Sequence, residues 1–156
     1  SNRIAVFDDG IVQQLSTPDV LYEKPENSFV AQFIGENNRF SGIVKSIDGD
    51  YCEVEIDGGG TVRALKINVG AVGDKTQLSV RPERMNINKD INGENKFNGK
   101  VKELIYLGDH IRVRLSVYGN DEFIVKIPNE GDISFKENDE INLTCDSNDI
   151  RALDHK

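Results

Sequence analysis

The residue types that usually carry catalysis are sparse in this 156-residue sequence and are not spaced for it. His110 and His155 have no cysteine or aspartate partner at a spacing typical of nucleophilic or acid–base catalysis. Cys52 and Cys145 each lie inside an alternating apolar segment and lack the spacing of metal ligands, which indicates buried, reduced thiols of a cytosolic protein. We therefore expect no catalytic residue and no metal site in this chain.

The glycine-rich segments do not match a nucleotide-binding loop. The pattern Gly-x-x-x-x-Gly-Lys-Ser/Thr, whose backbone amides cradle phosphates, does not occur. Gly58-Gly59-Gly60 lacks both the Gly-x-Gly-x-x-Gly spacing and a helix after it, so it is interpreted as a turn. These absences predict that the chain binds no nucleotide cofactor and does not hydrolyse ATP.

The strongest candidate for a site is Arg81-Pro82-Glu83, which follows an alternating apolar segment. Pro82 has no N–H to give to a sheet, so it ends the strand and leaves Arg81 and Glu83 near the strand end. The two charged residues either pair with each other or the backbone to close the fold, or contact a neighbouring helix, a partner subunit or a regulatory ligand. Glu36 and Asn37 end the helical stretch, and we expect them to hydrogen-bond to Arg81.

The element that positions Glu36 and Asn37 is a helical stretch over residues 17–38. Thr17 can cap its first turn and Pro18 suits the first helical position, where no N–H is needed. Pro25 interrupts the helix because its ring clashes with the preceding turn, and Gly35 suits the left-handed position at a helix end. The pattern predicts two short helices joined by an elbow, with an apolar stripe on the second.

A hairpin is predicted before the elbow, in residues 1–16. The apolar run 4–7 and the returning segment 11–15 flank Asp8-Asp9-Gly10, which is a typical hairpin turn. Because an isolated two-stranded hairpin is only marginally stable in water, we expect it to be poorly ordered, to pack on another chain or to dock on the rest of the molecule.

After residue 38 the sequence alternates as strands do and repeats itself. Residues 39–45 align with residues 96–102, and residues 74–80 align with residues 139–145. The matches keep their order, which predicts two copies of one supersecondary unit. We place the half-repeats at residues 39–89 and 96–154, joined by a polar linker at 90–95. The expected fold is mainly β, a duplicated oligosaccharide-binding-fold-like barrel over residues 39–154.

The net charge of −8 argues against a nucleic-acid partner, because such binding depends on neutralising phosphates with Lys and Arg. An acidic chain can attract polycations, but ordinary soluble proteins are often acidic for solubility alone. No apolar run is long enough for a membrane span, and no signal peptide is visible.

Several motifs together resemble the end of the nucleotide-binding domain of an ATP-binding-cassette importer and the start of its C-terminal regulatory domain. They are GIVQQ at 10–14, Thr17-Pro18, LYEKP at 21–25, FVAQFIGEN at 29–37 and SVRPE at 79–83. The form with Phe-Ile-Gly-Glu-Asn is most similar to the spermidine/putrescine importer ATPase. The Arg-Pro-Glu motif resembles that of the transport-associated oligosaccharide-binding-fold (TOBE) domain.

This resemblance implies a TOBE/MOP-like regulatory domain from a subunit whose ATP and Mg are held in a missing nucleotide-binding domain. Residues 1–16 would then be the remnant of that domain and residues 17–38 the linker. The implied partners are a second ATPase subunit, transmembrane permease subunits and a polyamine ligand, at the cytoplasmic side of the inner membrane. Glu53, Glu55 and Asp57 are exposed carboxylates that such a ligand can contact.

Three alternatives stay open. The parent protein can import another solute, such as iron or a sugar, with the same domain plan. A nucleic-acid-binding barrel is opposed by the absence of Trp and by the charge of −8. A purely structural dimerisation module would bind no ligand at all.

Overall fold

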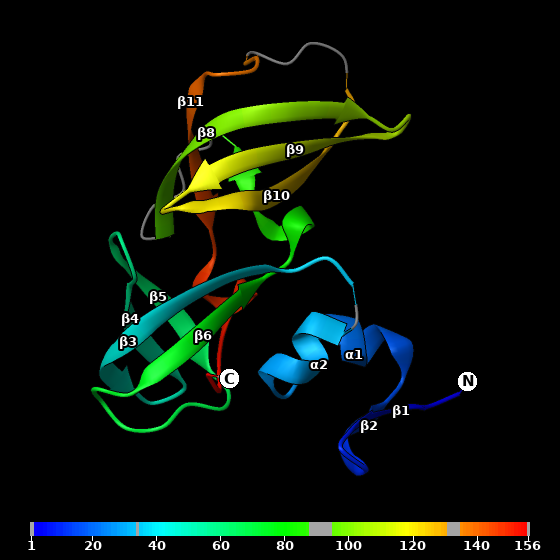
Figure 1. Cartoon of the computed structure of the whole chain (residues 1–156), viewed down its shortest axis with the longest axis vertical. Coiled ribbons are helices and arrows are strands. Elements are labelled where there is room, and N and C mark those ends of the chain that lie inside the picture. Colours follow the sequence, from blue (N-terminus) through cyan, green and yellow to red (C-terminus); the bar gives the residue numbers. More distant parts are fainter. Residues whose placement is uncertain (1, 34, 88–94, 131–134, 156) are drawn as a thin grey trace.

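The computed structural model describes residues 2–33, 35–87, 95–130 and 135–155. Figure 1 shows a hairpin and two short helices lying beside two strand-rich units, one above the other. Most of the predicted linker at 90–95 lies outside the described residues, and its last residue, Asn95, begins a strand.

The first strand-rich unit is a closed barrel with the strand order β12-β5-β4-β3-β6, and the second is a sheet with the order β10-β9-β8-β11-β7. The mainly β, barrel-type fold predicted from the sequence is confirmed. The strands of the first half are β3 (Asn38–Asp48), β4 (Tyr51–Ile56), β5 (Thr61–Lys66), β6 (Lys75–Val80) and β7 (Asn86–Ile87). Those of the second half are β8 (Asn95–Tyr106), β9 (His110–Val117), β10 (Asn120–Pro128), β11 (Glu140–Cys145) and β12 (Ile150–Leu153).

The two halves exchange their last strands. After β6 the chain makes a 3₁₀ turn, η1 (Pro82–Arg84), and β7 then pairs with β11 of the second sheet. After β11 it makes η2 (Ser147–Asp149), and β12 then pairs with β6 and β5 of the first barrel. Each unit is therefore completed by a strand from the other, a feature that sequence alignment of the repeats does not reveal.

The first strand of each half carries an asparagine that reaches across to the other unit. The side chain of Asn38 accepts from Ile124 N at 2.8 Å and donates to Ile124 O at 2.6 Å. Asn95, which is 57 positions later, accepts from Arg63 N at 2.9 Å and donates to Arg63 O at 2.8 Å. Each carboxamide thus imitates one step of a β-ladder and joins the two units.

A single hydrophobic core spans both units. Phe40 of β3 lies at their boundary, with ring centroids 5.9 Å from Phe97 of β8 and 5.2 Å from Phe123 of β10. Both cysteines are buried in this core, and they are not joined by a disulfide. The barrel and the sheet are therefore packed as one body rather than as two independent domains.

The helical elbow consists of α1 (Pro18–Glu23) and α2 (Ser28–Phe33), with Pro25 between them. The Asn27 side chain accepts from Val30 N at 2.9 Å and so caps α2. The expectation for Thr17 was wrong: its backbone is extended before α1, but its side chain makes no hydrogen bond that caps the helix.

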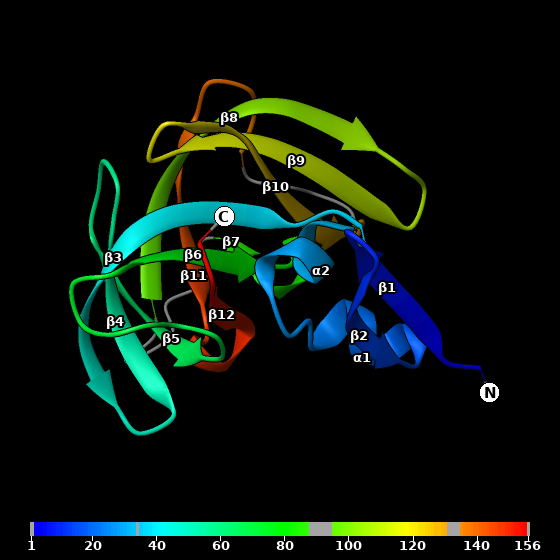
Figure 2. The same ribbon diagram turned by 60° about the horizontal axis from the view of Figure 1, so that its bottom comes forward.

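The predicted hairpin is formed by β1 (Ile4–Asp8) and β2 (Ile11–Ser16), with Asp9 and Gly10 at positive φ in the turn. One face of the hairpin, which carries Val6 and Gln14, packs against the helical elbow. Gln14 donates to Lys24 O at 3.2 Å and accepts from Glu26 N at 2.9 Å, while Val6 packs in a small cluster with residues of both helices. Figure 2 shows the hairpin beside α1, on the side away from the barrel strands β3–β5.

Candidate functional site at the joint

Arg81, at the end of β6, joins the barrel to the helical elbow of residues 17–38, which is called the arm below. It follows the last residue of β6, is only 5% exposed, and its Nε donates to Tyr22 O at 3.1 Å while its Nη1 donates to Glu36 O at 2.7 Å. Its guanidinium lies 4.4 Å from the centroid of the Tyr22 ring, within the range of a cation–π contact. Burial lowers the pKa of Arg81, but an arginine stays charged at any physiological pH. One buried cation thus holds both ends of the elbow.

Glu36 extends this connection to the second sheet. Its carboxylate accepts from Arg112 Nη2 at 2.5 Å and Nε at 3.2 Å, and it lies 2.9 Å from Lys126 Nζ. The hydrogen bond from Arg112 is the main reason that the pKa of Glu36 is lowered. Because the backbone carbonyl of Glu36 accepts from Arg81, this residue is fixed to both units at once.

The sequence predicts hydrogen bonds from Arg81 to both Glu36 and Asn37. Arg81 contacts Glu36 only through its backbone carbonyl, and Asn37 instead accepts from Ser79 Oγ at 2.5 Å. Arg81 and Glu83 were expected to pair with each other, with the backbone or with a neighbouring element. Glu83 accepts from the Tyr22 hydroxyl at 2.5 Å, so both charged residues of the motif contact the helix residue Tyr22.

Tyr22 was missed as a site residue because a tyrosine in a helical pattern is usually read as apolar surface. Desolvation by burial and its hydrogen bond to Glu83 raise its pKa, which keeps the hydroxyl protonated as a donor. Arg112 and Lys126 were missed as well. Nothing in the residue pattern of their strands indicated that Glu36 would meet them.

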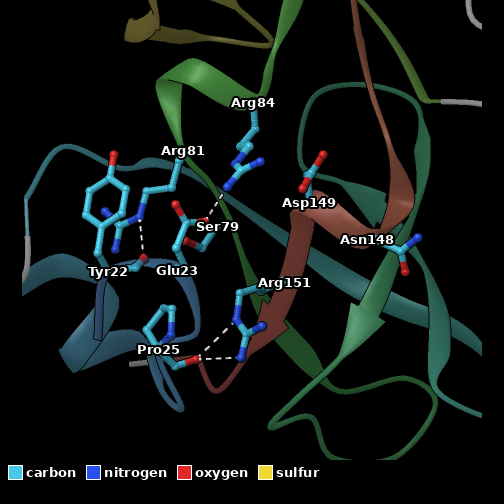
Figure 3. A pocket seen from close by; sticks show the side chains of 9 residues that line it. All are labelled: Tyr22, Glu23, Pro25, Ser79, Arg81, Arg84, Asn148, Asp149 and Arg151. Atoms are coloured by element: carbon cyan, nitrogen blue, oxygen red, sulfur yellow. Dashed lines mark hydrogen bonds and ion pairs between the residues drawn. The ribbon is translucent and has the colours of Figure 1, made fainter. Parts of the chain in front are cut away.

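A small cavity of about 30 Å³ lies between α1, η1, η2 and β12 (Figure 3). Its lining includes Arg84, which forms an ion pair with Glu23 at 2.6 Å, and Arg151, which donates to Pro25 O through Nε at 3.2 Å and Nη2 at 2.9 Å. Figure 3 shows Tyr22, Glu23 and Pro25 on the helical segment, Arg84 on η1 above them and Arg151 on β12 facing Pro25. The elbow is therefore held by arginines from both halves.

The side chains named above connect elements of the fold and are not arranged as a catalytic group. Among the described residues no group of three or more His, Cys, Asp and Glu side chains is placed to hold a metal ion. His110 Nδ1 lies 2.9 Å from the neighbouring Asp109 Oδ1, on an exposed strand end. None of the helices in the described part of the chain is both long and apolar enough to cross a membrane.

We expect Glu36→Gln to lower the free energy of unfolding by about 1 kcal/mol at neutral pH, since the carboxylate is partly exposed and its ion pairs are screened. The pKa of Glu36 is lower when the chain is folded, so its contribution is present above the unfolded pKa and disappears as the pH falls through the folded pKa. Urea unfolding at neutral and acidic pH measures this. Glu137→Gln removes the same charge from an exposed position and should change little. A difference between Glu36→Gln and the parent that grows toward acidic pH would contradict the ion-pair account.

Comparison with known proteins identifies the class. The family model described as "TOBE domain" matches residues 78–153, from β6 to β12. A solved structure of the cytoplasmic molybdate-binding protein ModG superposes with a TM-score of 0.63 and 17% identity, over 76% of this chain and 96% of that one. At this identity the likeness shows the fold alone. Residues 78–153 of this chain thus match a TOBE domain.

Within that class, its sequence is similar to spermidine/putrescine import ATP-binding proteins. It is 36% identical to the PotA protein of Trichodesmium erythraeum (strain IMS101), over 83% of this chain and 36% of the relative. It is 34% identical to PotA of Rubrobacter xylanophilus, over 89% and 34%, and 38% identical to PotA of Chromobacterium violaceum, over 70% and 31%. The chain spans about a third of the length of the curated relatives it matches.

Proposed function

We propose that this chain is the non-catalytic, C-terminal regulatory and dimerisation domain of the ATPase subunit of a polyamine importer. The relatives named above supply the class of importer. The observation that carries the regulatory role is the joint: Arg81 and Glu36 fix the helical arm to both strand-rich units. A rigid connection of this kind transmits a change of position at one end to the other.

Exposed apolar side chains on the hairpin and the elbow support a partner there. Phe7 is 57% exposed, Ile11 65% and Leu15 53%, and Phe33 at the end of α2 is 63% exposed. Large apolar side chains left in solvent on so short a segment favour a contact with another part of the parent protein. We propose that the nucleotide-binding part of the subunit, which would hold ATP and Mg, covers these side chains and joins the permease subunits at the cytoplasmic side of the inner membrane.

In this mechanism the two nucleotide-binding domains of a homodimer lie at one of two distances from each other, and regulation shifts the balance between these two states. A ligand or partner that binds one of these states more tightly increases the population of that state, and the ATPase rate changes with it. The size of the shift is set by the difference between its affinities for the two states. In the full-length subunit that carries this chain, Glu36→Gln should therefore alter the response of the ATPase to a regulator while leaving the affinity for ATP unchanged. Arg39→Gln, an exposed change of one charge, is the control. An identical regulatory response in Glu36→Gln and parent would count against the joint as the transmitting element.

A polyamine is the regulator that this role suggests, and two surfaces offer the carboxylates it needs. Glu53 and Glu55 on β4, with Asp57 after it, form one, although Glu55 lies 3.9 Å from Lys45. The other is a groove of about 470 Å³ at the joint, whose lining includes Tyr22, Glu83, Asp109, His110, Lys126, Ile127 and Pro128. We favour the groove, because a ligand there touches both the arm and the second sheet.

Equilibrium binding of spermidine to the 156-residue chain, at low and moderate salt, tests this. Asp109→Asn should weaken binding about three- to tenfold if the groove is the site, whereas Glu53→Gln should do so if the β4 face is. The absence of saturable binding would favour a purely structural dimerisation module. Saturable binding of an iron chelate or a sugar instead would assign the chain to an importer of that solute.

A further inference from the structure

The bend between α1 and α2, residues 24–28, has backbone groups that its own short helices cannot satisfy. α1 ends at Glu23 and α2 begins at Ser28. The last carbonyls of one helix and the first amides of the next have no partner inside a helix, and buried backbone groups need one. In the bend these partners are side chains that come from the hairpin and from β12 with the residue after it.

The hairpin holds the bend mainly through one buried side chain. Gln14 is 4% exposed; its Nε2 donates to Lys24 O at 3.2 Å and its Oε1 accepts from Glu26 N at 2.9 Å. The neighbouring Gln13 adds a contact, because its Oε1 accepts from Asn27 Nδ2 at 2.9 Å. A carboxamide that bonds both a carbonyl and an amide two residues apart restricts the backbone between them, so the hairpin fixes the bend from its side.

β12 and the residue after it hold the bend from the other side. Arg151 donates to Pro25 O through Nε at 3.2 Å and through Nη2 at 2.9 Å, as the dashed lines of Figure 3 show. Asp154 Oδ1 accepts from Ser28 N at 2.8 Å. Ser28 is 0% exposed, so water does not reach this amide, and Asp154 is its acceptor in the folded chain.

Along the bend these two sources of partners alternate. The hairpin bonds to the backbone of Lys24 and Glu26, whereas β12 and the residue after it bond to the backbone of Pro25 and Ser28. Adjacent peptide groups share backbone dihedral angles, so a rotation that frees a group from one side also displaces the groups that the other side holds. The two sets of contacts therefore depend on the same conformation of a short segment.

We propose that the bend is a cooperative latch, in which the contacts with the hairpin and the contacts with β12 are made and lost together. β12 is the strand that the second half contributes to the first barrel, so the latch connects the hairpin to the place where the two units cross. It is separate from the joint at Arg81 and Glu36, and it passes a displacement of the hairpin to the barrel through backbone groups. This proposal concerns the folded chain alone and does not depend on the proposed role in an importer.

Hydrogen exchange of the native 156-residue chain, followed by NMR at two amides, tests the latch. Glu26 N–H donates to the hairpin and Ser28 N–H donates to Asp154, so the two amides report on opposite sides. Arg151→Met is the decisive variant, because it removes the bonds to Pro25 O and leaves the acceptors of both reporter amides in place. We expect it to speed exchange at both amides by about five- to tenfold, the effect of losing about one net hydrogen bond from the closed state.

Gln14→Ala and Asp154→Ala each remove the acceptor of one reporter amide, and each should also speed exchange at the other. The amide of Val54, which is buried in the first barrel, should keep its exchange rate, and Glu137→Gln, an exposed change, should alter none of the three amides. If Arg151→Met speeds exchange at one reporter or at neither, the two sides hold the bend independently and the proposal is wrong. An equal increase at Val54 would mean that the bend opens only with the whole fold, and no separate latch would then exist.

Discussion

Asn38→Ala is expected to lower the free energy of unfolding by about 2–4 kcal/mol, although it removes only one small polar side chain. The side chain is 2% exposed, and it satisfies both the N–H and the carbonyl of Ile124 in the neighbouring sheet. β10 is the edge strand of that sheet, so no other strand can take over these bonds. The alanine variant leaves two backbone groups buried without partners, which costs far more than the net value of the two bonds. Chemical denaturation followed by circular dichroism measures the loss.

Asn95 provides the matched comparison, since it makes the same pair of bonds to Arg63 in a partly exposed place. Water can replace its carboxamide there, so Asn95→Ala should cost about 1 kcal/mol or less. Asn38→Asp keeps the shape but loses the donor to Ile124 O, and it should be at least as damaging as alanine. A loss of less than about 1 kcal/mol in the free energy of unfolding for Asn38→Ala, or equal losses for Asn38→Ala and Asn95→Ala, would refute this role of Asn38 at the edge strand β10.

The local elements were predictable because their signals are local. Asp8-Asp9-Gly10 makes the hairpin turn, with Asp9 at φ 53° and Gly10 at φ 76°, and Pro25 divides the two helices. Residues 39–45 and 96–102, which align in the sequence, lie near the start of two long strands, β3 and β8. In each case the residue types restrict the backbone or the buried face without reference to distant parts of the chain.

The exchange of β7 and β12 was not predictable, for a physical reason. β7 has two residues and β12 has four, and alternation in such short strands says which face is buried but not which strand is the neighbour. The partners of Arg81 were hidden for a similar reason. It binds the backbone carbonyls of Tyr22 and Glu36, and every residue has a carbonyl, so residue types do not reveal the contact.

The exchange of strands also bears on how the joint works. Arg81 stands where β6 leaves the first unit and Arg151 lies in the strand that returns to it. Both therefore occupy the crossing between the units, and both hold carbonyls of the elbow. We therefore expect a displacement of the arm to move the two units together, as the proposed regulatory role requires.

Phe40→Ala should lower the free energy of unfolding by about 3–5 kcal/mol, the usual cost of removing a fully packed aromatic ring. Phe40 is 6% exposed and contacts rings from both β8 and β10, so the cavity would open at the boundary between the units. Because the core is continuous and each unit needs a strand from the other, the variant should still unfold in one transition. Calorimetry and urea unfolding monitored by two probes measure both the loss and the cooperativity.

Phe40→Leu distinguishes the lost volume from the lost ring contacts. Leucine fills much of the space, so it should recover more than half of the stability if packing dominates. Phe33→Ala, at the exposed end of α2, is the control for removing a phenyl ring without opening a core, and it should cost less than about 1 kcal/mol. If Phe40→Ala instead produced two separate transitions, the barrel and the sheet would have to be independent folding units, and a joint that holds both through Arg81 and Glu36 could not act on them as one body.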